Sequence, residues 1–250
     1  MKALITGASS GIGLDMAKYL ATMKYELILV ARNKEKLEKI QQELPTKVTV
    51  IIADLSNEQK TKELYALVKK ENIDILINNA GFGLFGDFTE SNLNRELEMI
   101  DTNIKAVHIL TKFILRDMEK KNSGYILNVA SLAAFQAGPL MSTYYATKSY
   151  VYRLSNALYY EQKKKKTNVH ISVLCPGPVD TNFNNVANCH FTVKALPSEF
   201  VARYAINEMF KGKMTIIPGF KMKFVRFITR FIPDKILLKL TYNIQKRKAN

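Results

Sequence analysis

The chain has 250 residues, 47% of them hydrophobic and 24% charged, proportions that exclude an intrinsically disordered protein. Its two cysteines are too few for a disulfide framework or a structural zinc site, and no stretch is long and apolar enough to predict a transmembrane helix. The net charge of +15 is unevenly placed, because residues 211–250 contribute +10 of it, from eleven Lys and Arg against one acidic residue. A basic end on a nearly balanced body indicates a surface for attachment or for a partner.

Short apolar runs alternate with helical patterns along the first 217 residues. The apolar runs predict strands at 3–5, 26–31, 48–53, 74–77, 125–129, 170–174 and 214–217. The spacing of apolar residues between them predicts helices at 12–23, 34–44, 58–70, 95–120, 142–163 and 198–212, the last with Ser198 as its N-cap. Continuous apolar strands separated by helices are typical of a parallel sheet covered on both faces. We therefore expect a doubly wound, Rossmann-type α/β domain of about seven strands over residues 1–217, with its ligand at the carboxyl ends of the strands.

The first predicted strand runs into a glycine-rich turn that directly precedes a helix. Glycines permit a tight turn here, and they let a pyrophosphate approach the amides and the positive dipole at the helix start. The GxxxGxG spacing also occurs in ordinary turns, but the strand–turn–helix setting within a parallel sheet makes it a predicted dinucleotide site. The residues expected to bind the cofactor here are Gly7, Ser9, Ser10, Gly11, Ile12 and Gly13.

The next three predicted strands also end in residues suited to a dinucleotide. An acidic residue after the second strand would accept the ribose hydroxyl of NAD, whereas Arg32 stands there and can pair with the 2′-phosphate of NADP. The sequence therefore favours NADP(H) over NAD(H), the alternative being a surface arginine at the start of a helix. Asp54 and Leu55 follow the third strand, where they would meet an adenine ring, and Asn78 and Asn79 follow the fourth.

Tyr144 and Lys148 lie four residues apart in the helix predicted at 142–163, and Ser131 lies thirteen positions before Tyr144. Residues at i and i+4 share one face of a helix. An ammonium beside a phenol favours the phenolate, and it can lower the phenol pKa of about 10 by roughly one to three units. The pair therefore predicts a general acid/base, with Ser131 polarising the group on which it acts. The same spacing also occurs in ordinary helices with a solvated lysine.

Taken together, these motifs resemble, in order and spacing, those of the classical subgroup of the short-chain dehydrogenase/reductase family, over about residues 2–217. The residues that carry the resemblance are Thr6 to Gly13, Asp54-Leu55, Asn78 to Gly81, Asn103, Ser131, Tyr144 to Lys148 and Pro176-Gly177. The resemblance implies that Tyr144 exchanges the substrate proton, that Lys148 lowers the pKa of Tyr144 and holds the nicotinamide ribose, and that Ser131 steadies the substrate oxygen. It also implies that Asn103 anchors a water linking Lys148 to solvent. The residues implied to lie against the nicotinamide are Pro176, Gly177, Val179 and Thr181, the last two binding its amide.

The implied activity is NADP(H)-dependent transfer of a hydride between nicotinamide and a carbonyl or secondary alcohol, with Tyr144 as proton donor or acceptor. The scheme needs no metal, and the alternative is a noncatalytic NADP-binding sensor on the same fold. In this family the segment after Thr181 closes over the substrate. Here Phe183, Val186, Phe191 and Val193 indicate an apolar or amphipathic substrate or, equally well, packing on the body. The resemblance further implies a homodimer or homotetramer.

Residues 218–250 are predicted to form a basic amphipathic helical extension. Between residues 221 and 232 one helical face is apolar and the other carries Lys223, Arg226 and Arg230, and Pro233 interrupts the pattern before it resumes. Such a helix suits an anionic membrane surface or a partner's groove, or its apolar face packs on its own domain or on a second subunit. Peripheral contact with an anionic membrane through residues 221–250 is one hypothesis.

Two further expectations concern partners and location. The net charge would attract nucleic acid, but the sequence has no recognised nucleic-acid motif, so no such partner is expected. A strand is predicted from the first residues, which leaves no room for a signal peptide and favours a cytoplasmic protein.

Overall fold

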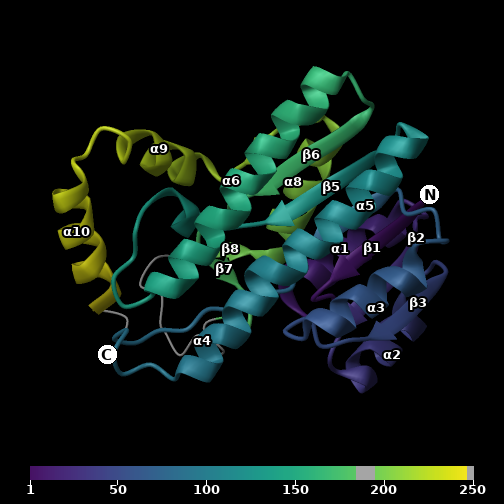
Figure 1. Ribbon diagram of the computed structural model, residues 1–250, viewed down its shortest axis with the longest axis horizontal. Helices are drawn as coiled ribbons and strands as arrows, with labels where there is room; N and C mark the ends of the chain where they lie inside the picture. The colour runs from purple at the N-terminus through teal and green to yellow at the C-terminus, as the bar shows by residue number, and fades with distance from the viewer. Residues whose placement is uncertain (184–194, 247–250) are drawn as a thin grey trace.

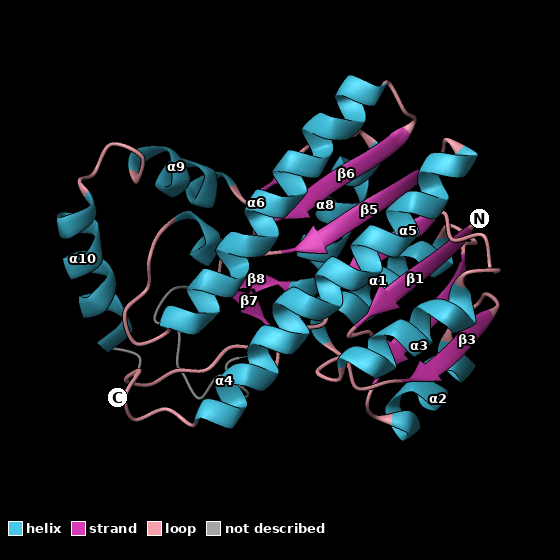
Figure 2. Cartoon of the chain, viewed as in Figure 1, coloured by secondary structure: helices cyan, strands magenta, loops and turns pink. Residues whose placement is uncertain are grey.

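The computed structural model describes residues 1–183 and 195–246, and its centre is a parallel sheet of seven strands with helices on both faces (Figures 1 and 2). The strands are β1 Lys2–Thr6, β2 Glu26–Ala31, β3 Val48–Ile52, β4 Ile75–Asn78, β5 Gly124–Val129, β6 Val169–Leu174 and β9 Thr215–Ile216. They lie in the order β3-β2-β1-β4-β5-β6-β9, and every neighbouring pair is parallel. The predicted doubly wound α/β fold is confirmed.

Alternate residues of the strands point to opposite faces of the sheet and enter two apolar layers. Ile5 of β1 belongs to the layer that packs against α1, α2 and α8, whereas Leu4 belongs to the layer against α3 and α5. Both layers are closed to solvent, which explains why the strands are continuous apolar runs. The helices are α1 Gly11–Thr22, α2 Lys34–Glu43, α3 Glu58–Val68, α4 Leu93–Ile100, α5 Val107–Lys121, α6 Ser142–Lys165 and α8 Ser198–Phe210.

Asparagine side chains start three of the helices. Asn33, Asn57 and Asn92 occupy the N-cap positions of α2, α3 and α4, and each side chain accepts a hydrogen bond from a backbone N–H three residues further on. Such a cap satisfies one of the amides that the first turn leaves unpaired, and it contributes about 1 kcal/mol. The three caps therefore fix the first residue of α2, α3 and α4, which follow β2, β3 and β4 along the chain.

The strand order reverses beside β1, whose two neighbours are β2 and β4. After β3 the chain returns across β1 to form β4, so the loops after β1 and β4 leave the sheet in opposite directions. This divergence opens a crevice at the carboxyl ends of the strands, where ligands of doubly wound sheets bind. The fold therefore brings the predicted motif residues to one edge of the sheet.

The helix predicted at 95–120 is not uniformly α-helical. A π-helical segment, Asp101–Ala106, separates α4 from α5 and contains Asn103. The spacing of apolar residues correctly predicted the α-helical parts on either side, α4 and α5. It cannot reveal a π-helical segment, because such a segment changes which backbone groups are hydrogen-bonded and not the types of residue.

The predicted N-cap at Ser198 is wrong. Pro197 occupies the cap position of α8, and Ser198 is its first residue. Within the described residues the buried Ser198 hydroxyl has no hydrogen-bond partner. The reason lies in an unpredicted parallel pair of short strands, β7 Val179–Asp180 and β8 Leu196–Pro197, which brings the chain into the helix directly from an extended pair.

Two helices follow the last strand, and they lie apart from the layers of the sheet, at one side of the body (Figure 1). They are α9 Phe220–Ile228 and α10 Asp234–Lys246, here called the tail helices. Pro233 directly precedes α10, as the interrupted pattern predicted, because proline ends one helix and is tolerated at the start of the next. Over residues 1–183 and 195–246, the structure has no helix of the length and apolarity needed to cross a membrane.

Candidate active site

A cavity of about 570 Å³ lies at the carboxyl ends of the strands, a volume typical of sites for cofactors and small molecules. It extends from the loop after β1 and the ends of β2 and β3 to α6 and the segment after β6. The residues predicted for the site that line it are Gly7, Ser9, Ser10, Gly11, Ile12, Arg32, Asp54, Leu55, Asn79, Ser131, Tyr144, Lys148, Pro176, Gly177, Val179 and Thr181.

The loop after β1 is fixed to the turn after β4 by hydrogen bonds. The Thr6 hydroxyl accepts from the backbone N–H groups of Asn79 and Ala80, at 3.0 and 3.1 Å. The Asn79 side-chain amide donates to the carbonyls of Thr6 and Gly7, both at 3.1 Å. Gly7 has a φ of +65°, and a Cβ there would lie 2.8 Å from Ala80 Cα. A side chain at Gly13 would overlap the Asn79 amide, so these glycines are needed for the close approach of the two loops.

The start of α1 forms part of the wall of the cavity. Ser10 occupies the N-cap position with an extended backbone, and its side chain makes no capping hydrogen bond. Ser10, Gly11 and Ile12 all line the cavity. A helix start without a cap, at the positive end of the dipole, is suited to an anion such as a pyrophosphate. The loop therefore fits the diphosphate of a dinucleotide cofactor.

Arg32 lies at the end of the cavity formed by β2 and β3, together with Asp54 and Leu55. Its side chain is 65% exposed, and Nη1 pairs with Glu98 Oε1 on α4 at 3.2 Å. The Asp54 carboxylate accepts hydrogen bonds from the backbone N–H and the hydroxyl of Ser56, so it is directed toward its own loop. Arg32 thus presents a guanidinium at the cavity edge, held by one exposed ion pair that an anionic ligand could replace.

Lys148 is buried in the opposite part of the cavity. Nζ donates to the carbonyl of Val129, the last residue of β5, at 3.0 Å, and lies 5.8 Å from the centroid of the Tyr144 ring. Because burial removes the ammonium from water, it lowers the pKa of Lys148 to about 8. Gly81 makes room for this group, since a Cβ there would lie 3.3 Å from Nζ. The structure therefore holds an ammonium with little solvation directly beside the tyrosine.

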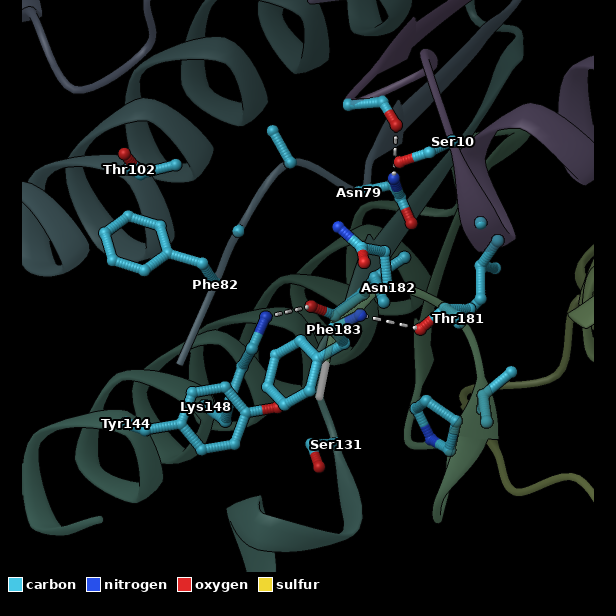
Figure 3. A pocket seen from close by; sticks show the side chains of 18 of the residues that line it. Ser10, Asn79, Phe82, Thr102, Ser131, Tyr144, Lys148, Thr181, Asn182 and Phe183 are labelled. Atoms are coloured by element: carbon cyan, nitrogen blue, oxygen red, sulfur yellow. Dashed lines mark hydrogen bonds between the residues drawn. The ribbon is translucent and has the colours of Figure 1, made fainter. Parts of the chain in front are cut away.

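Tyr144, Lys148 and Ser131 are gathered in one part of the cavity, with the ring of Phe183 beside Tyr144 (Figure 3). Tyr144 and Lys148 come from the same face of α6, as their spacing predicts, and the Phe183 ring centroid lies 5.4 Å from that of Tyr144. Ser131 follows β5 and begins the short 3₁₀-helix Leu132–Phe135, its hydroxyl accepting from the Ala133 N–H at 3.1 Å. A phenol, an ammonium and a hydroxyl thus converge where a substrate oxygen can be bound.

Three predicted site residues do not line the cavity: Gly13, Asn78 and Asn103. Asn78 is buried in the sheet, where its amide donates to Asn128 at 2.8 Å and to Thr111 at 3.0 Å. Its place at a strand end predicts proximity to a cofactor but not the direction of its side chain. Asn78 therefore joins neighbouring elements of the core.

Asn103 is fully buried in the π-helical segment. Its Oδ1 accepts from the Phe82 N–H at 3.1 Å, and its Nδ2 donates to the Phe82 carbonyl at 2.9 Å and to the Thr147 hydroxyl at 3.0 Å. The Asn103 side chain therefore connects the turn after β4 with α6, and its contact on α6 is Thr147, the residue before Lys148. That Asn103 also anchors a water, as the sequence resemblance implies, stays a prediction.

Several lining residues were not predicted. Met141 and Tyr145 lie at the start of α6, and Ile244 reaches the cavity from α10. Tyr145 could have been found from its place next to Tyr144. Ile244 gives no such signal, because its position depends on the folding back of a distant segment. Of the apolar residues predicted to close over the substrate, Phe183 lines the cavity, whereas Val186, Phe191 and Val193 lie outside the described residues.

Cys175 lies near the site but is not placed to react. It is buried and free, and burial raises the pKa of its thiol well above the ordinary value. A protonated, inaccessible thiol is a poor nucleophile. Among the residues that the structure describes, no group of three His, Cys, Asp or Glu side chains could hold a metal ion.

Comparison with known proteins gives consistent matches. The short chain dehydrogenase family model matches residues 1–190. An uncharacterized oxidoreductase of Staphylococcus epidermidis is 34% identical over 181 residues, covering 72% of this chain and 78% of the relative. A short-chain dehydrogenase from Sphingobium yanoikuyae in complex with NADPH has a TM-score of 0.82 at 26% identity, covering 93% of this chain and 96% of that one. The bulky-bulky ketone specific alcohol dehydrogenase from Comamonas testosteroni has a TM-score of 0.78 at 26% identity, covering 93% and 94%.

Proposed function

The chain belongs to the short-chain dehydrogenase family of oxidoreductases, and on this premise we propose that it uses NADP(H) to interconvert a carbonyl and a secondary alcohol. The observation that carries the proposal is the convergence of Tyr144, Lys148 and Ser131 in one part of a cavity whose other end has the features of a dinucleotide site. Residues 1–217 form the catalytic unit, and residues 218–250 are an extension of it.

The cofactor end of the cavity supports NADP(H). The uncapped start of α1 would bind the pyrophosphate, and Arg32 would pair with the 2′-phosphate in place of Glu98. Asp54 and Leu55 would lie beside the adenine. At the other end, Lys148 would bind the nicotinamide ribose, and the residues after β6 would lie against the nicotinamide ring. When bound, this cofactor supplies or accepts the hydride.

The proton is exchanged by Tyr144. In the reducing direction, hydride addition to the carbonyl carbon leaves negative charge on its oxygen, and the Tyr144 hydroxyl donates its proton to that oxygen. The Lys148 ammonium stabilises the resulting phenolate, and it does so effectively because burial weakens the screening by water. The Ser131 hydroxyl donates a hydrogen bond to the same substrate oxygen. In the oxidising direction each transfer is reversed.

The substrate end of the cavity supports an apolar or amphipathic substrate. Its walls include Phe82, Met141, Tyr145, Phe183 and Ile244, which offer mostly hydrocarbon surface. A bulky ketone or the matching secondary alcohol suits such a lining, because its oxygen can face Ser131 and Tyr144 while its substituents contact apolar side chains.

The first test is turnover of a panel of ketones and secondary alcohols, followed by the absorbance of the reduced nicotinamide. Tyr144→Phe should lower kcat by about a hundredfold to ten-thousandfold, the usual contribution of a general acid. Tyr150→Phe is the matched control, since Tyr150 lies on the same helix and its hydroxyl bonds to His108 outside the cavity. Equal activity of the two variants would refute the role of Tyr144. Cofactor binding without turnover of any substrate would instead favour a noncatalytic sensor.

The second test concerns the choice of cofactor. Arg32→Ala should raise KM for NADPH roughly tenfold to a hundredfold, since it removes a charge-assisted hydrogen bond, and should leave KM for NADH unchanged. Arg95→Ala is the control, because Arg95 pairs with the same Glu98 carboxylate but does not line the cavity. A similar loss for both nucleotides in Arg32→Ala would remove the case for NADP(H).

A further inference from the structure

The tail helix α10 is fastened to the body by polar side chains. Thr241 and Gln245, one turn apart, are both buried. The Gln136 amide donates to the Thr241 hydroxyl at 2.9 Å, and the Gln245 amide donates to the Tyr145 hydroxyl at 2.6 Å. These two polar side chains of the helix therefore lie against its own domain, next to the cavity.

The tail helix α9 has the same orientation. Arg226 lies over the ring of Phe135, with its guanidinium carbon 3.9 Å from the ring centroid. Met222, one turn earlier, packs over Gly177, where a Cβ would lie 2.8 Å from its sulfur. Both contacts, like that of Lys223 with Tyr204 of α8, join the helix to the body. Its apolar stripe is therefore turned outward, which is the reverse of a helix that packs its apolar side on its own core.

The exposed surface of the tail helices is strongly apolar. Of the twenty-one large hydrophobic side chains exposed in the described residues, eleven belong to these two helices and the turn between them. Phe224 and Phe227 are 55% and 57% exposed, and Phe231 is 73% exposed. The eleven are Phe220, Phe224, Val225, Phe227, Ile228, Phe231, Ile236, Leu238, Leu240, Tyr242 and Ile244. A surface of this kind marks an interaction site.

The same helices are cationic. Residues 220–246 contain seven Lys and Arg and one acidic residue, Asp234, a net charge of +6. Two of the cations have aromatic rather than acidic neighbours: Lys223 lies over the ring of Tyr204 and Arg226 over that of Phe135. An aromatic ring carries no negative charge, so these two contacts do not neutralise Lys223 or Arg226. Exposed aromatic rings and positive charge thus occur together on one pair of helices.

We propose that the tail helices dock on an anionic lipid surface, with the exposed Phe side chains entering the headgroup region and the cations contacting lipid phosphates. Neither helix is long enough to span a bilayer, and amphipathic helices that lie in the interface combine these two features. A second copy of the chain is a poorer occupant, because a symmetric dimer through this face would set +6 against +6.

The docked surface would continue to the entrance of the cavity. Ile244 lines the cavity and is also 51% exposed, as part of the outer apolar set. Docking through α10 therefore brings the substrate end of the cavity next to the lipid. This placement suits an apolar substrate that dissolves in the bilayer rather than in water, but docking itself does not depend on the proposed oxidoreductase activity.

The absence of tryptophan from the sequence provides a direct probe. In the full-length protein, Phe227→Trp should show a shift of emission to shorter wavelength with vesicles of phosphatidylcholine and phosphatidylglycerol, and no shift with phosphatidylcholine alone. Leu67→Trp is the matched control, since Leu67 is 65% exposed on α3, and its emission should not change. Raised salt should weaken the response of Phe227→Trp, because it screens the attraction between the cations and the lipid phosphates.

Two variants extend the test to sedimentation with the same vesicles. Phe224→Ser together with Phe231→Ser should weaken binding on the order of tenfold or more, because two apolar side chains no longer enter the interface. Lys235→Gln together with Lys239→Gln should weaken it about fivefold for each charge removed. Equal binding of both variants and the original protein would overturn the proposal, as would an emission of Phe227→Trp that anionic vesicles leave unchanged. An oligomer that the two Ser substitutions dissociate, without any effect of vesicles, would assign the face to a second copy.

Discussion

Replacing Lys148 with methionine should remove a pH dependence of stability that the buried ammonium creates. Methionine has a similar length and no charge, so it fills the same space without a desolvation cost. The comparison is made in a Tyr144→Phe background, which takes the neighbouring phenol out of the titration. In the structure Nζ is buried and donates to the Val129 carbonyl, and burial lowers the pKa of Lys148 to about 8 from its ordinary 10.5.

The sign follows from proton binding in the two states. Below about pH 8 the folded and unfolded chains both hold the Lys148 proton, and the folded state carries the whole cost of the buried charge. Between about pH 8 and 10.5 the folded protein has released the proton and the unfolded chain still holds it, so stability rises with pH. The difference of 10.5 and about 8 corresponds to about 3 kcal/mol, and about 2.5 kcal/mol of this develops between roughly pH 7 and pH 10.

Urea unfolding of Tyr144→Phe and of Tyr144→Phe/Lys148→Met, followed by circular dichroism at these two pH values, measures the effect. The free energy of unfolding of the lysine protein should gain about 2.5 kcal/mol on the methionine protein from the lower to the higher pH. Loss of the hydrogen bond to Val129 costs the methionine protein about 1 kcal/mol, but equally at both pH values. A difference between the two proteins that does not change with pH would refute the reasoning.

Further predictions concern packing around the site. Gly13→Ala should cost about 1–3 kcal/mol of stability and weaken nucleotide binding, because its Cβ has no room; an unchanged melting temperature and affinity would contradict this. Replacing the other cysteine, by Cys189→Ser, leaves Cys175 as the single thiol. Cys175 should then not react with a disulfide reagent until the protein unfolds, since the thiol is buried and its pKa is raised. Rapid reaction of the native protein would disprove this prediction. Gln245→Leu, which removes the bond to the Tyr145 hydroxyl, should lower the free energy of unfolding by about 1 kcal/mol and speed proteolysis of the tail; unchanged proteolysis would show that this bond does not hold α10.

The sequence was most informative at the ends of the strands. Apolar runs separated by helices predict a parallel sheet, and a parallel sheet places the carboxyl ends of all its strands at the same edge. Arg32 on one side, and Ser131 and Tyr144 on the other, are distant in the chain and could still be assigned to one cavity from the sequence. The spacing of Tyr144 and Lys148 also gave their shared helix face correctly.

The sequence was less informative about the direction of side chains and about distant contacts. Asn78 is the last residue of β4 and Asn79 is the first residue after it, yet Asn78 points into the core and Asn79 lines the cavity, because the direction of the chain changes where the strand ends. The π-helical turn around Asn103 leaves no trace in apolar spacing.

The orientation of the tail helices on the body could not be predicted from the sequence. Its amphipathic pattern was clear, but a pattern cannot tell which face is turned toward the body. The structure turns Met222 and Arg226 inward and Phe224 outward, and this depends on contacts with Gly177 and Phe135 that lie far away in the chain.

The pairing of β7 with β8 joins two parts of the chain that an engineer could use as anchors. Val179 pairs with Leu196 and Asp180 with Pro197, so the two short strands hold each other in place side by side. A replacement segment grafted between these anchors would keep the β6 loop and the start of α8 in place. Doubling the length of such a graft would add only about 0.6 kcal/mol of closure entropy. The two short strands thus provide fixed attachment points for a grafted segment.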